Sequence, residues 1–245
     1  MTSALSFLPF LFIFSVAHSA PLKLDYRPEV TMSAKELLSL PGGNRVEVAK
    51  KRGAEFVAEL ERLAFSAQED YGLRWKALIL SAQIQGMRAE KTLQRALKAP
   101  EWFMRNAALL AYQDILPLKA TPFALDLLKD KALVVRSAAV QVLAKNPTSS
   151  IRESLWEELG NAHNFRRKQS LFIRHQILAA LARDPADKEL PLFVQHLREN
   201  DSKLHASAIS ALEKLTSQRF GQKNDSLEKK RVLWMKWAKN TPEAK

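Results

Sequence analysis

The sequence predicts an all-α protein made of about five consecutive helix pairs, followed by one helix that covers the last pair. Three observations lead to this prediction. The chain has 245 residues, of which 47% are hydrophobic and only 7 are glycine, and this composition suits helices better than hairpins that need glycine turns. Apolar residues recur at helical spacing from Glu47 almost to the C-terminus. Along this stretch, the same short pattern around a cation returns five times.

Residues 1–20 are the first expected element, a secretory signal peptide. Residues 4–17 carry no charge and are rich in Phe, Leu and Ile, and small residues follow at Ala17, Ser19 and Ala20. This pattern is typical of a cleaved export signal, and the apolar stretch is shorter than the roughly 20 residues that a membrane span needs. An uncleaved anchor is the alternative. We expect an exported, periplasmic protein with no stable membrane span after cleavage.

Residues 21–45 are interpreted as an extended N-terminal arm. Pro21, Pro28, Pro41 and the Gly42–Gly43 pair surround one short apolar patch at residues 34–38. Because Pro and Gly interrupt regular elements, this patch leaves room for one short helix at most.

Residues 46–221 contain the repeats, each built around one cation. The five cations are spaced by 31, 31, 38 and 31 residues: Arg74, Arg105, Arg136, Arg174 and His205. Positions one before and three, four and six after each cation are all apolar and lie on one helix face. The position three after the cation is Ala in four of the five repeats, namely Ala77, Ala108, Ala139 and Ala208. An amphipathic helix alone does not require a small residue there, so this column predicts close packing between neighbouring pairs. By the same register, Ser137 is expected to face water.

A partner helix precedes each cation. Apolar residues lie twelve and eight positions before the cation in the second, third and fifth repeats: Leu93, Leu97, Ala124, Leu128, Phe193 and Leu197. In the fourth repeat the pattern returns as Leu155 and Leu159 only after a shift of seven residues. The sequence therefore predicts an insertion between the two helices of the fourth pair, within residues 160–169.

Residues that commonly begin or end helices agree with these boundaries. Thr121 and Pro122 are expected to cap and begin the first helix of the third pair, because Pro is favoured at the first helical position. No segment alternates convincingly with period two, so no strand is expected.

Residues 222–245 are expected to form a capping helix and tail. Trp234 and Trp237 lie on one helix face, with Leu233 nearby. The end of a helical stack exposes an apolar face that needs a cover, so we expect both tryptophans to act as a lid. An aromatic platform for a ligand is the alternative.

The pattern resembles HEAT repeats. The best match is residues 128–139, where Asp130 stands in the turn within the pair and Arg136 follows in the second helix. The C-terminal motif Arg231-x-x-Trp234-x-x-Trp237-x-x-Asn240, preceded by Phe220-Gly221, is similar to the last segment of many exported bacterial HEAT-repeat proteins. The resemblance implies an α-solenoid that binds other macromolecules. It also implies a structural role for Arg74, Arg105, Arg136 and Arg174, which would hydrogen-bond between neighbouring repeats. His205 in the last Arg position and the insertion depart from the pattern.

Few patterns point to catalysis. The chain has no cysteine, which excludes disulfides, thiolate metal sites and a Cys nucleophile. It has no His-Glu-x-x-His, no Gly-x-Ser-x-Gly and no Gly-rich phosphate loop. Glu153, Glu157 and Glu158 are interpreted as a solvated helix face. We therefore expect no cofactor, no metal and no enzymatic activity.

The charge points to the kind of partner. A net charge of +12 favours an anionic or acidic neighbour. Arg166, Arg167 and Lys168 lie in the insertion and are the candidate partner-binding residues, with a merely solvated loop as the alternative. We predict a monomeric scaffold that binds an acidic protein in the cell envelope. The alternative is a binder of an anionic envelope polymer or, less favoured, nucleic acid, and the salt dependence of binding separates the two.

Overall fold

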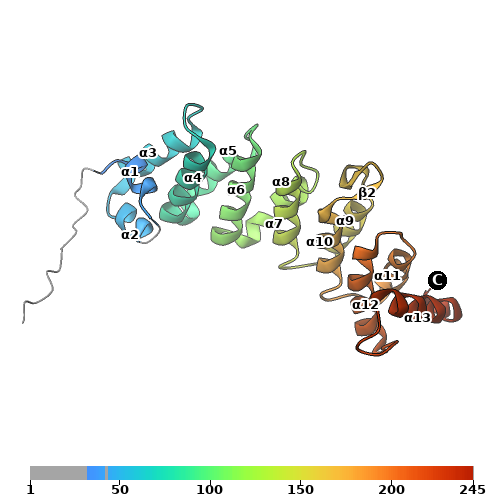
Figure 1. Ribbon diagram of the computed structural model, residues 1–245. Helices are drawn as coiled ribbons and strands as arrows, with labels where there is room; N and C mark the ends of the chain where they lie inside the picture. Colours follow the sequence, from blue (N-terminus) through green and yellow to red (C-terminus); the bar gives the residue numbers. More distant parts are fainter. Residues whose placement is uncertain (1–31, 42–43, 245) are drawn as a thin grey trace, which may run out of the picture. The chain divides into compact units, whose positions relative to one another are not determined.

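The computed structural model describes residues 32–41 and 44–244, and these are all-α apart from one small hairpin (Figure 1). The expected signal segment 1–20 and residues 21–31 of the expected arm lie outside the described residues. Ser33–Lys245 form one compact unit. Within the described ranges, none of the helices has the length and apolar character that crossing a bilayer requires.

The unit begins with two short helices, α1 (Ala34–Ser39) and α2 (Arg45–Lys50). A capping box starts α1, because the Ser33 hydroxyl accepts from the Glu36 N–H and the Glu36 carboxylate accepts from the Ser33 N–H. Leu37 and Leu38 are buried, and α1 packs on α3 (Gly53–Phe65) and α4 (Tyr71–Gln85). The described part of the expected arm is therefore folded, and packing begins at Ser33 rather than at residue 46.

Five helix pairs follow in order, joined by short turns. They are α3 (Gly53–Phe65) with α4 (Tyr71–Gln85), α5 (Glu90–Leu97) with α6 (Trp102–Ile115), α7 (Pro117–Leu127) with α8 (Leu133–Leu143), α9 (Ser149–Leu159) with α10 (Phe172–Leu181), and α11 (Leu190–Leu197) with α12 (Ser202–Thr216). Single 3₁₀ turns lie at Gly86–Ala89, Ala162–Asn164, Asp187–Glu189 and Pro242–Ala244.

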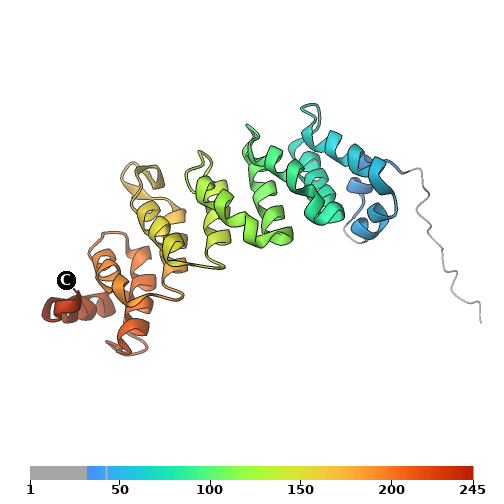
Figure 2. The same ribbon diagram turned by 180° about the vertical axis from the view of Figure 1, so that it is seen from behind.

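The second helices of the pairs pack directly on one another, in the order α4, α6, α8, α10 and α12. The two opposite views show these helices on one side of the unit and the first helices on the other (Figures 1 and 2). The alanine column lies in these contacts, with Ala77, Ala108, Ala139 and Ala208 fully buried. Small side chains there let neighbouring helices approach closely. Of the twenty apolar positions around the five cations, all but Leu73 are buried.

The third pair starts earlier than expected. Helix α7 begins at Pro117, and Pro122 lies inside the helix rather than at its first position. Pro117 lacks only an N–H that a first turn leaves unpaired, whereas Pro122 removes a hydrogen bond within the helix. The prediction that Thr121 caps this helix is therefore wrong.

The insertion lies between α9 and α10, where the seven-residue shift placed it. It contains a short antiparallel hairpin, β1 (Phe165–Arg166) and β2 (Gln169–Ser170). The prediction that no strand exists is wrong for these residues, because two-residue strands are too short to show an alternating pattern.

The last helix, α13 (Leu227–Asn240), packs on α11 and α12. Trp234 is completely buried, and its ring meets Phe220 edge-on with centroids 4.7 Å apart. Trp237 lies against Trp234 in a second edge-to-face contact of 5.1 Å. Helix α13 thus covers the last pair, in the position that a lid requires.

Candidate interaction surface

The repeat cations are bound inside the molecule. Arg105 shows the pattern: its Nη1 donates to the carbonyls of Ala99 and Pro100, each at 2.8 Å, in the turn of its own pair. Its Nε and Nη2 donate to the Asp130 carboxylate at 2.6 and 2.8 Å, in the turn of the next pair. One guanidinium therefore joins two successive turns, a task suited to its planar set of donors.

The other arginines do the same. Each binds a carbonyl at the turn of its own pair: Ala64 for Arg74, Asp130 for Arg136 and Leu159 for Arg174. Each also reaches the next turn, where the acceptors are Glu101 for Arg74, Asn164 for Arg136 and Glu199 for Arg174. We call this set of contacts the arginine relay.

His205 ends the arginine relay. Its Nε2 lies 2.9 Å from the Glu199 carbonyl in the turn of its own pair. An imidazole has no fork with which to span two turns, and in the described part of the chain α12 is followed by the single helix α13 rather than by another pair. All five cations of the column are at most 8% exposed. Because their donors are used within the fold, these side chains are unavailable as a surface stripe for phosphate.

Charge compensation in the arginine relay shifts the pKa values of the acids. Burial alone would raise the pKa of the Asp130 carboxyl, but hydrogen bonds from Arg105 and the Ala132 N–H hold it below its usual range. The hydrogen bond with Asp130 in turn raises the pKa of Arg105.

A second set of cations lies at the opposite ends of the second helices. Nine residues after the repeat cation stand Lys145, Arg183 and Lys214 in the last three repeats. Arg183 donates to the Ala144 carbonyl at 3.3 Å, and Lys214 donates to the Arg183 carbonyl at 2.7 Å. Cations suit helix C-terminal ends because free carbonyls and the helix dipole are there. The constant spacing of nine residues after the repeat cation is a sequence signal for these three cations, and the apolar pattern does not reveal it.

An apolar surface lies at the first turns of the second helices. Tyr71 is 68% exposed, Trp102 47%, Val134 44% and Phe172 64%. Tyr71 and Trp102 stand three residues before a repeat cation, and Val134 and Phe172 stand two before it, so all four lie in the first turn of a second helix. With two further exposed side chains they define the apolar stripe: Tyr71, Trp75, Trp102, Leu133, Val134 and Phe172.

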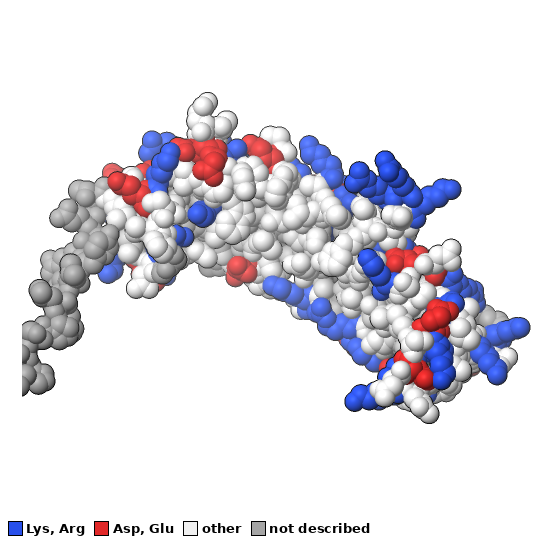
Figure 3. All heavy atoms as spheres, in the orientation of Figure 1, with Lys and Arg blue, Asp and Glu red and all other residues white. Residues whose placement is uncertain are grey.

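Contacts link the apolar stripe across the first three pairs. The half-buried Phe103 lies between the rings of Tyr71 and Trp102, with centroid distances of 5.9 and 6.1 Å. Asn106 then donates to the Val134 carbonyl on the next helix. Figure 3 shows few charged side chains over the middle of the face in view, and both acidic and basic side chains along its upper edge. Contiguous exposed apolar surface of this kind marks interaction sites on soluble proteins.

The apolar stripe ends at a pocket. In the fifth pair the equivalent positions hold Ser202 and Lys203. Before them, the ring of Phe172 meets that of His175 edge-on at 6.1 Å. His175 lines an open pocket of about 460 Å³ between the hairpin and the start of α12. Its lining comprises Phe165, Lys168, Gln169, Ser170, Arg174, His175, Glu199, Asn200, Asp201 and Lys203.

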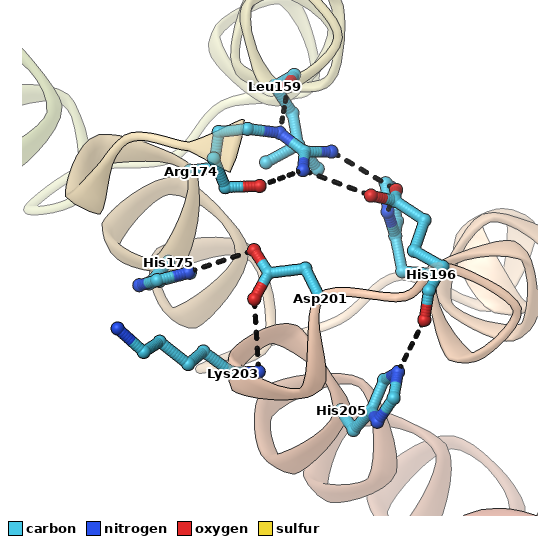
Figure 4. A network of polar contacts seen from close by, with 9 residues as sticks. Leu159, Arg174, His175, His196, Asp201, Lys203 and His205 are labelled. Atoms are coloured by element: carbon cyan, nitrogen blue, oxygen red, sulfur yellow. Dashed lines mark hydrogen bonds and ion pairs between the residues drawn. The ribbon is translucent and has the colours of Figure 1, made fainter. Parts of the chain in front are cut away.

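The acids of this pocket already have hydrogen-bond partners within the fold (Figure 4). Glu199 accepts from Arg174 at 3.0 and 3.1 Å and also contacts the Nδ1 of His196. Asp201 lies 3.0 Å from the Nε2 of His175 and caps α12 by accepting from the Lys203 N–H. Burial opposes ionisation of both acids, but these partners outweigh it, so the pKa values of Glu199 and Asp201 are lowered.

His196 lies behind Glu199. Burial lowers the pKa of His196 below its ordinary value, although the neighbouring Glu199 acts in the opposite direction. The imidazole also stacks on Trp156, with centroids 5.6 Å apart. His196 is therefore a packed side chain.

The three candidate cations of the insertion are exposed. Arg166, Arg167 and Lys168 form no side-chain hydrogen bond or ion pair with any other residue that the structure describes. Arg167 and Lys168 form the hairpin turn, and both have positive φ, +50° and +66°. Only Lys168 of the three lines the pocket. The structure therefore brings one of the predicted residues to the end of the apolar stripe.

Glu158 is buried, contrary to the expectation from the sequence. It was interpreted as solvated together with Glu153 and Glu157, and those two are exposed, but Glu158 is buried. Its carboxylate accepts from the Asn164 amide at 2.7 Å and contacts the Nε2 of His163. Because the insertion folds back over the end of α9, Glu158 holds the insertion in place.

Comparison with known proteins found no family model that matches the chain and no similar curated sequence. Across residues 32–41 and 44–244, no three His, Asp or Glu side chains are grouped as metal ligands would be.

Proposed function

We propose that the chain is a HEAT-type α-solenoid and a non-enzymatic scaffold that binds one protein partner. Residues 46–221 form the solenoid in this proposal, and residues 222–245 form its cap and tail. The stacking of the second helices and the arginine relay support the assignment, because both couple each pair to the next.

The apolar stripe is the observation that carries the proposed function. A folded monomer gains little from exposing large apolar side chains in the first turn of the second helix in four successive pairs. A partner that covers Tyr71, Trp102 and Phe172 would bury large rings, and such rings dominate the binding energy of protein interfaces.

We propose that this partner is acidic. The exposed cations of the hairpin stand beside one end of the apolar stripe, and the net charge is +12. Charges at the rim of an interface speed association and set its salt dependence more than its final affinity. The scaffold acts as an exported, periplasmic monomer without a cofactor in this proposal, and the partner belongs to the cell envelope.

The test is capture of the partner from an envelope extract by tagged protein. A Trp102→Ser/Val134→Ser variant should capture the same partner about tenfold less well or worse, since a single interface aromatic can contribute about 2 kcal/mol. The matched control is Met87→Ser/Leu118→Ser, which removes two exposed apolar side chains outside the apolar stripe and should capture normally.

Two results would contradict the proposal. Equal capture by both double variants would show that the apolar stripe does not bind the partner. Capture of an anionic polymer or nucleic acid, lost steeply with salt but unaffected by the Trp102→Ser/Val134→Ser change, would favour the charge-driven alternative.

A further inference from the structure

We propose that the pocket between the hairpin and α12 binds carboxylate side chains, so that the partner carries acidic residues next to the segment that covers the apolar stripe. This inference rests on the proposed function for the identity of the partner. The charge of the pocket follows from its own residues and does not depend on the proposed function.

The first step is the balance of charge in the pocket. Both of its acids, Glu199 and Asp201, already have cationic or imidazole partners. Two of its cations do not: the ammonium groups of Lys168 and Lys203 make no ion pair or hydrogen bond with the described residues. The three Lys and Arg side chains of the pocket outnumber its two carboxylates, so the pocket carries a net positive charge. The two free ammonium groups come from the hairpin and from α12.

The second step is the position of these charges. Figure 4 shows the side chain of Lys203 extending beside His175, on the same side of Asp201. Phe172, the last member of the apolar stripe, contacts that same imidazole. A chain that covers Phe172 therefore reaches the pocket within its next few residues.

The third step is the choice of carboxylate over phosphate. Guanidinium forks and free N–H groups at a helix N-terminus bind phosphate through several hydrogen bonds of fixed geometry, whereas lysine binds it as a point charge. Here the Arg174 fork is occupied by Glu199, and the Asp201 side chain accepts from the first turn of α12. Two flexible ammonium groups remain, and these suit the side chains of Glu or Asp.

The hairpin turn adds a supporting observation. Arg167 and Lys168 occupy the left-handed region, which residues with a side chain rarely adopt. A type I′-like turn would normally use Asn and Gly here. The chain instead holds two long cations at the tip, beside the pocket that Lys168 lines.

The experiment uses a fluorescein-labelled hexaglutamate peptide and measures its anisotropy with the folded protein over a range of salt concentrations. Lys168→Gln/Lys203→Gln should weaken peptide binding about tenfold or more, because hydrogen bonds to charged groups are worth about 1.5–3 kcal/mol each. The matched control is Lys236→Gln/Lys239→Gln, which removes two exposed lysines of α13 outside the pocket and should bind almost normally.

Three outcomes overturn the inference. They are no binding of the peptide even at low salt, equal losses in the pocket and control variants, and displacement of the peptide by inorganic phosphate at lower concentration than by free glutamate. Equal losses would mean diffuse attraction rather than a site.

The Trp102→Ser/Val134→Ser variant separates this inference from the proposed function. It should bind hexaglutamate normally while losing the partner. If peptide binding fails but capture still depends on the apolar stripe, only the pocket assignment is wrong. If the pocket binds the peptide but the Trp102→Ser/Val134→Ser variant captures the partner as well as the wild type does, the proposed function is wrong.

Discussion

The turn between α7 and α8 and the turn between α9 and α10 receive the same kind of arginine in different ways. In the short turn, the Asp130 carboxylate accepts two hydrogen bonds from Arg105 and one from the Ala132 N–H. In the long turn, Arg136 meets the neutral amide oxygen of Asn164 at 3.1 Å. The negative charge of the long turn lies one step further away, on the buried Glu158 that Asn164 contacts.

This difference shows that the donor and the acceptor follow different rules. The arginine belongs to a helix whose register is strict, so it always arrives at the same place. The acceptor belongs to a turn of variable length, so whichever polar group the turn brings there is used. The following changes test how much the difference matters.

The largest expected effect comes from removing each acceptor. Asp130→Ala should cost about 3–5 kcal/mol of the free energy of unfolding, because it leaves the buried Arg105 guanidinium without its counter-charge. Asn164→Ala should cost about 1–3 kcal/mol, because Arg136 keeps three backbone carbonyls as acceptors. Urea unfolding measures both, and equal losses would contradict the distinction.

The pH dependence sharpens the same comparison. The pKa of Asp130 is lowered in the folded protein, so its contribution is complete above the ordinary pKa of Asp, about 3.9, and is lost as pH falls through the lowered value. The difference in stability between the wild type and Asp130→Asn should therefore shrink from pH 7 to pH 3. The difference in stability between the wild type and Asn164→Ala, measured by urea unfolding over the same pH range, should change less. A pH-independent difference for Asp130→Asn would refute the argument.

The smallest expected effect on stability comes from changing the hairpin, which is present in the long turn between α9 and α10 and not in the short one between α7 and α8. Arg167→Asn/Lys168→Gly should leave the melting temperature unchanged or raise it slightly, corresponding to at most about 1 kcal/mol, because Asn-Gly prefers the turn that both residues now adopt under strain. Arg166→Ser, which removes a charge outside the turn, is the control and should be neutral. A clear loss of stability in the double variant would mean that the two cations support the fold.

The sequence allowed the donors to be predicted, but not the acceptors or the surface. Register alone placed Arg136 and the insertion correctly, because helix periodicity is local. Ser137 was expected to face water, yet it is half-buried and donates to Gln176 on α10 at 2.6 Å. Glu158 was misjudged for the same physical reason: its burial depends on a segment that folds back from later in the chain.

The apolar stripe had a sequence signal that was not used. Aromatic and aliphatic residues two or three positions before the cation recur in four repeats. Their exposure could not be derived from the pattern, because it depends on how neighbouring second helices pack. One short helix was allowed for at residues 34–38, and the capping-box spacing of Ser33 and Glu36 was a further sequence signal for it that was not used.

The arginine relay also gives the stack a direction. Each of the four arginines in the arginine relay reaches towards the pair that follows it, so cutting the protein after α8 would leave Arg136 without Asn164. Cutting it before α7 would instead leave Asp130 without its guanidinium, and a carboxylate at an open end is readily hydrated. During synthesis on the ribosome, the arginine of each completed pair likewise lacks part of its hydrogen-bond acceptors until the turn of the next pair has been made. Stability should therefore grow in steps from the N-terminal side, and fragments ending after a complete turn should survive better than fragments ending before it.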